Sequence, residues 1–291
     1  MPESSGGTLL GRLFPPSLDS TLGKRLPRLV IEGLVFTGVA LYLALLIGFE
    51  EPGLVSIFLV SASLSERIRF LLDENRRNVW DSTLSSWQAN KLTALSLLAI
   101  FMGIITAYFI YAFGSGVDGI IQTFEFVVEA SGLGEGSLLT RQFSSFKGIL
   151  ANNLIVLLCI VILAFIYRAY GAMLALCWNA CVWAAAITVL TLRTAHNPGA
   201  NNLSDIILAA TALLPHLILE GFAYVIGALA AIYLSQAISK YRLRDPRFVV
   251  VGRACLILIL IAIATVALGS AVESSLVPYI LGQLEGGSLA Q

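Results

Sequence analysis

Two titratable side chains stand one helical turn apart inside a long apolar segment, and they are the residues best suited to chemistry. The segment ALLPHLILEGFAY contains Pro215, His216 and Glu220, and His216 is one of only two histidines in the chain. Residues four apart lie on the same face of a helix. Such an imidazole and carboxyl are suited to proton transfer, to ligand binding or to bonding with a neighbouring helix.

The remaining chemistry-bearing residues do not complete an enzyme motif. A helical zinc-protease motif needs two histidines with a glutamate between them, whereas the second histidine here, His196, lies across the span in a loop. No serine or cysteine nucleophile has a signature spacing, and there is no phosphate-binding loop. We therefore predict no catalytic residue, no cofactor and no metal site, and an intramembrane hydrolase using Glu220 and His216 is the least favoured alternative.

Composition indicates an integral membrane protein. The chain has 291 residues, of which 57% are hydrophobic and 12% charged, against about 25% charged in soluble domains. Several runs with no charge or one charge approach the ~20 residues that cross ~30 Å of hydrocarbon. They do not alternate as the strands of a membrane barrel do. The six strong spans are residues 29–49, 92–113, 149–167, 169–192, 206–238 and 248–272.

Charge distribution predicts a topology. Lys and Arg accumulate on the cytoplasmic side of membrane proteins, and here they cluster in residues 12–28, 67–91 and 240–253 and at Arg168. These clusters share one side only if residues 53–71 return towards the cytoplasm, although that segment is short for a full crossing. We therefore expect a short or re-entrant helix there, a cytoplasmic N-terminus and an extracytoplasmic C-terminus in the plasma membrane. The net charge of zero gives no indication of a nucleic-acid partner.

The sequence thus predicts an all-α, polytopic transmembrane helix bundle as a single domain over residues 29–272. Residues 1–28 are expected to form a cytoplasmic tail and residues 273–291 a short C-terminal tail. Within the loop 114–148, apolar residues of 117–128 recur at helical spacing. This pattern predicts an amphipathic helix lying on the outer interface. The four cysteines all lie in apolar spans and are expected to be small buried hydrophobic residues without disulfides.

Polar groups in hydrocarbon need partners, and five of them are expected to meet in the outer half of the bundle. Pro215 removes a backbone hydrogen bond, which predicts a kink that divides residues 206–238 into a short arm and a spanning helix. The predicted intramembrane polar cluster is Asn152, Asn153, Asn179, His216 and Glu220. It is interpreted either as a hydrogen-bonded clamp between helices or as a site open to the outside.

Three segments resemble the stage II sporulation protein M family. They are FKGILANNLIVLL (146–158), YGAMLALCWNACVWAAAITV (170–189) and LLPHLILEGFAYVIGALAAIYLSQAI (213–238), and the similarity covers about residues 143–240. The family's signature polar positions fall on Asn152, Asn153, Asn179, His216 and Glu220. The resemblance implies a multi-pass membrane protein that is not itself a hydrolase. The founding member is the membrane component of a cell-wall-remodelling complex in spore engulfment.

Two functions are expected from these observations. The first is a non-enzymatic scaffold that contacts the lipid bilayer and a membrane or extracytoplasmic protein partner, with a homo-oligomer left open. The alternative is a transporter or channel subunit that uses the kinked helix carrying His216 and Glu220, because discontinuous helices often build substrate sites.

Overall fold

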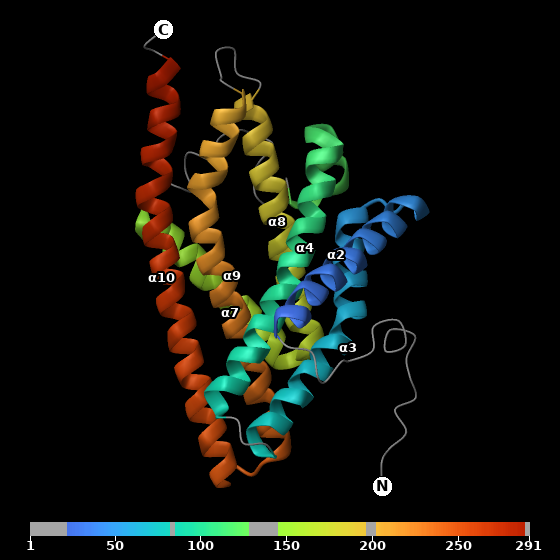
Figure 1. Cartoon of the computed structure of the whole chain (residues 1–291), viewed down its shortest axis with the longest axis vertical. Coiled ribbons are helices and arrows are strands. Elements are labelled where there is room, and N and C mark those ends of the chain that lie inside the picture. Colours follow the sequence, from blue (N-terminus) through green and yellow to red (C-terminus); the bar gives the residue numbers. More distant parts are fainter. Residues whose placement is uncertain (1–21, 82–84, 128–144, 196–201, 289–291) are drawn as a thin grey trace.

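The computed structural model describes residues 22–81, 85–127, 145–195 and 202–288, and these residues form a bundle of helices without strands (Figure 1). Six of the helices are long and apolar enough to cross a membrane. This confirms the predicted polytopic helical bundle, and the chain is a multi-pass integral membrane protein. The helices are α2 (Leu22–Ile47), α3 (Pro52–Trp80), α4 (Ser86–Thr123), α7 (Phe146–Tyr167), α8 (Ala169–Ala195), α9 (Asn202–Lys240) and α10 (Pro246–Ser288).

Helix α3 differs in length from the short element expected over residues 53–71. It runs unbroken for 29 residues. Arg25, near the start of α2, bonds to Glu74, near the end of α3, at 2.6 and 2.8 Å, as expected for two antiparallel helices. Further along, Arg67 donates to Glu32 at 2.7 and 3.0 Å. Glu32 is 1% exposed, so partners on the facing helix satisfy the charges that made each segment unsuited to lipid when taken alone.

The described parts of the basic clusters 67–91 and 240–253 lie at one end of the bundle. The end of α3, the start of α4 and the α9–α10 connection lie at the lower end of Figure 1, while the end of α8 and the start of α9 lie at the upper end. Arg247 of α10 stacks over Trp80 of α3 at 5.8 Å. Arg168, between α7 and α8, donates to Ser239 of α9 at 2.6 Å. This arrangement agrees with the charge pattern used to predict the topology, and the orientation itself stays a prediction.

A glycine divides α4 near its C-terminal end. Gly116 has φ 70° and ψ −175°, a conformation that residues with a side chain rarely adopt. The helix resumes after Gly116 and ends at Thr123. Ile120 in this last part and Phe124 just beyond it are fully buried. Phe124 packs edge-on against Tyr108 and Tyr111, with ring centroids 5.9 and 5.8 Å apart. Most of the predicted amphipathic helix 117–128 is therefore helical, up to Thr123 and again over 125–127, but its apolar face covers protein. Residues 128–144 lie outside the described residues.

Helix α9 runs through Pro215 as one helix from Asn202 to Lys240. The expected division into an arm and a separate spanning helix was therefore wrong. Proline has a φ close to the helical value, so it costs one backbone hydrogen bond without requiring the chain to leave the helix. A bend at Pro215 stays a prediction.

The first and last described helices extend beyond the spans predicted from the sequence. Helix α2 begins at Leu22, inside the segment assigned to the N-terminal tail, and α10 continues to Ser288 through most of the segment assigned to the C-terminal tail. Glu273, which the sequence analysis assigned to that tail, is only 6% exposed. The added turns of α10 thus bring a third acidic residue, after Glu32 and Glu220, into the bundle.

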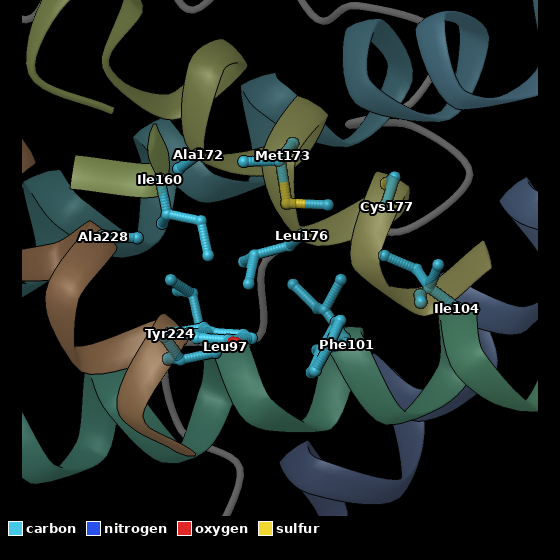
Figure 2. Close-up of a cluster of buried hydrophobic side chains, with 14 of the residues drawn as sticks. Leu97, Phe101, Ile104, Ile160, Ala172, Met173, Leu176, Cys177, Tyr224 and Ala228 are labelled. Atoms are coloured by element: carbon cyan, nitrogen blue, oxygen red, sulfur yellow. The ribbon is translucent and has the colours of Figure 1, made fainter. Parts of the chain in front are cut away.

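Helix α8 lies at the centre of the packed core. Its residues Ala172, Met173, Leu176 and Cys177 meet side chains of α4, α7 and α9 in the cluster of Figure 2. Each of these four side chains is at most 2% exposed. Cys177 and Cys181 are buried and unbonded, as expected, whereas Cys159 of α7 is free and exposed. The tight packing around α8 holds α7 and α9 at fixed positions beside it.

Candidate functional site

The central contact of the site joins α7 to α9. Asn153 lies in the third turn of α7, where Nδ2 donates a hydrogen bond to Oε1 of Glu220 on α9, a residue 67 positions later. Asn153 is 6% exposed and Glu220 4% exposed. The exposed Asn152 donates to Oδ1 of Asn153 at 3.2 Å. Three of the five predicted polar residues thus form a continuous hydrogen-bonded chain.

His216 belongs to the same region but not to this chain. It lies one turn before Glu220 on α9 and is 5% exposed. Its Nδ1 has no hydrogen-bond partner among the described residues. A Cβ added at Gly269 of α10 would lie 3.6 Å from both the His216 carbonyl oxygen and Cγ of Glu220. These are ordinary van der Waals distances, so α10 packs directly against this face of α9 at Gly269.

Helix α10 contributes two polar residues that the sequence analysis missed. Ser270 is fully buried and its Oγ has no partner among the described residues. The Glu273 carboxyl lies within electrostatic range of both Glu220 and Tyr224. The spacing of Val266, Ser270 and Glu273 could have identified them, because these residues share one helix face. Glu273 lies one residue beyond the predicted end of the span at residue 272.

Asn179 lies on α8 and does not bond to the other polar residues. Its Nδ2 donates to the carbonyl oxygen of Ala175, one turn earlier, at 2.8 Å. It nevertheless borders the same cavity, which has a volume of about 500 Å³ and lies between α7, α8 and α9. The polar residues on its wall are Asn152, Asn153, Asn179, Glu220, Tyr224, Trp178 and Trp183. Four of the five predicted residues therefore share one cavity, and His216 does not line it.

Aromatic rings fix the shape of this cavity. Trp183 stacks on Tyr224 with ring centroids 6.0 Å apart, and Phe101 of α4 meets Trp183 edge-on at 5.7 Å. At the other side, Trp178 contacts Phe126, which follows the end of α4, with ring centroids 4.9 Å apart. Gly221 permits this packing, because a Cβ there would lie 3.1 Å from Phe101. The wall is therefore built from tightly packed side chains of several helices.

This arrangement is suited to binding and to helix pairing. His216 and Glu220 form no hydrogen bond or ion pair with each other in the described structure, so they are not an assembled acid–base pair. Among the described residues, no three His, Cys, Asp or Glu side chains converge as metal ligands. The site presents one buried carboxyl, amide groups and aromatic faces to a cavity.

Comparisons with protein-family models, with curated proteins and with solved structures gave no match. The chain is therefore described by its own geometry as a multi-pass membrane protein whose buried Asn153–Glu220 contact borders a cavity among three helices.

Proposed function

We propose that the protein is a non-enzymatic membrane scaffold, the integral component of a complex with a membrane or extracytoplasmic protein partner. The supporting observation is the bond between Asn153 and Glu220. These two residues belong to separate segments that resemble the stage II sporulation protein M family, and they serve to hold two helices together. If these residues serve the architecture of the bundle, a partner is recognised by other residues on the protein surface.

Residues 117–127, which follow Gly116, offer such a surface. While Ile120 and Phe124 face the protein interior, Asp118, Gln122 and Glu125 on the opposite face are exposed. This polar face is fixed on a packed base instead of a free loop, so it can dock a partner without first being ordered. With the N-terminus in the cytoplasm of a plasma-membrane protein, it faces the extracytoplasmic side, where a wall-remodelling partner would act.

Site-specific photocrosslinking in the native membrane tests this proposal. A photoreactive amino acid replaces Glu125, and in a matched control it replaces Leu260 of α10, which is 57% exposed and faces lipid in the proposed arrangement. We expect one defined protein to be crosslinked from position 125 only, and to capture this chain in the reciprocal experiment. Crosslinks to lipid alone from both positions contradict the scaffold function, and crosslinks of the chain to itself identify a homo-oligomer.

The cavity favours a second candidate function, a transporter or channel subunit. This candidate no longer has the support of a broken helix, because α9 is continuous, but Glu220 still borders a cavity among the helices. Solute flux into proteoliposomes that is lost in Glu220→Gln, with the protein still folded, is the expected result for this function.

A further inference from the structure

We propose that the cavity between α7, α8 and α9 is a binding site for an amphiphilic amine, a molecule with an apolar body and one ammonium group, which enters from the bilayer. The site goes beyond the scaffold function and does not depend on it. Its volume of about 500 Å³ is within the ~300–1,000 Å³ of typical small-molecule pockets.

The carboxyl at the cavity calls for a positively charged group. Glu220 is 4% exposed, and the described hydrogen bond uses only Oε1. Glu273 adds a second acidic group nearby. No described Lys, Arg or His forms an ion pair with either residue. A buried carboxylate is costly unless it is paired, and an ammonium bonding to Oε2 of Glu220 would supply both the charge and the donor.

The aromatic wall suits the same group. The rings of Trp183 and Tyr224 lie beside Glu220 on the cavity surface, and the faces of such rings attract cations. An anionic or purely apolar ligand would gain nothing from this combination of carboxyl and ring faces. The polar part of the cavity therefore selects for a cation over a neutral molecule of the same shape.

The remaining wall is apolar and reaches the lipid-facing surface. Ile155 borders the cavity and is 62% exposed, and Trp178 is 39% exposed. At the other end, Ile160 and Tyr224 are at most 1% exposed, and Figure 2 shows both within the packed core. The cavity is thus closed on the inside by the bundle and open on the side of α7 that meets hydrocarbon. An apolar tail would remain in that opening.

Cys159 provides a reporter of occupancy. It borders the cavity and is exposed, whereas Cys177, Cys181 and Cys255 are buried. The full-length protein in phosphatidylcholine nanodiscs is treated at neutral pH with a methanethiosulfonate reagent, which does not consume amines. The rate of Cys159 modification is measured with decylamine and, as the uncharged probe of matched length, with decanol.

We expect decylamine to slow Cys159 modification in wild type and decanol to have no comparable effect. Glu220→Gln keeps a carbonyl oxygen for Asn153 but loses the charge, so it should weaken decylamine binding about tenfold or more, as expected for a lost charge-assisted bond. Asp73→Asn is the matched control, because it removes an equal charge from an exposed position on α3; it should bind as wild type does.

Three results would overturn the proposal: no protection by decylamine, equal protection by decylamine and decanol, or undiminished protection in Glu220→Gln. Equal protection would identify simple partition of a hydrophobic molecule into the opening. Should Glu220→Gln fail to fold, Val156→Trp provides a second test, because the larger side chain fills the cavity from α7. Protection that persists in a folded Val156→Trp protein would equally contradict the site.

Discussion

Replacing both partners of the Asn153–Glu220 contact should disturb the protein less than replacing either one. The two side chains are 6% and 4% exposed, so each single change leaves a buried polar group without its partner. We expect Asn153→Leu and Glu220→Met each to lower the free energy of unfolding by about 1–3 kcal/mol. The double variant removes both polar groups with similar shapes retained, and its cost should fall below about 1 kcal/mol.

The assay is a reversible titration with sodium dodecyl sulfate in mixed micelles, followed by the fluorescence of the tryptophans in the bundle. The non-additivity of the cycle measures the coupling between the two residues. Asn153→Leu combined with the remote Asp73→Asn serves as the control pair and should be additive within about 0.5 kcal/mol. If the Asn153→Leu/Glu220→Met costs also add within that margin, the two residues are not energetically coupled and the clamp interpretation is refuted.

Three further predictions follow from packing elsewhere in the bundle. Glu32→Ala removes the acceptor of both Arg67 bonds and should lower the free energy of unfolding by about 3 kcal/mol in the same titration. This value is the lower end for a broken buried pair, because 16% of the Arg67 side chain is exposed. A cost below about 1 kcal/mol would show that water replaces the carboxylate. Gly103→Ala places a Cβ 2.1 Å from the carbonyl oxygen of Val30 and should cost about 1–3 kcal/mol. By contrast, Gly38→Ala meets nothing within 4 Å and should be neutral or stabilising by up to about 1 kcal/mol; equal effects would contradict close α2–α4 packing. Mass spectrometry after brief thiol labelling of the folded protein should find Cys159 modified before the three buried cysteines, and early modification of Cys177 would contradict the packed core around α8.

The bundle architecture was predictable because it depends on single helices. An apolar run of about 20 residues with at most one charge must cross the membrane or be buried, and this rule identified the six spans. The extent of α3 was not predictable in the same way. Arg67 makes its segment unsuited to lipid by itself, yet Glu32 on another helix accepts its hydrogen bonds. That compensation depends on which helices pack together.

The polar cluster was predicted in part for a similar reason. Burial required partners for Asn153 and Glu220, and they found each other. Asn179 instead bonds to a carbonyl of its own helix, an alternative available to any helical asparagine near the preceding turn. Breaks in helices were also difficult to predict: α9 passes through Pro215, whereas Gly116 turns α4 by adopting positive φ. Glycine permits that conformation without requiring it.

The 67 residues between Asn153 and Glu220 impose an order on biosynthesis. At about 5–20 residues per second, the ribosome delivers the acceptor roughly 3–13 seconds after the donor. During that interval α7 and α8 leave the ribosome, and the side chain of Asn153 has only its neighbour Asn152 as a hydrogen-bond partner. Because an unpaired polar group in hydrocarbon is costly, we expect α7 and α8 to remain beside the insertion machinery until α9 arrives. A delay in translation between codons 168 and 220 would lengthen the time during which the Asn153 amide lacks its carboxyl partner.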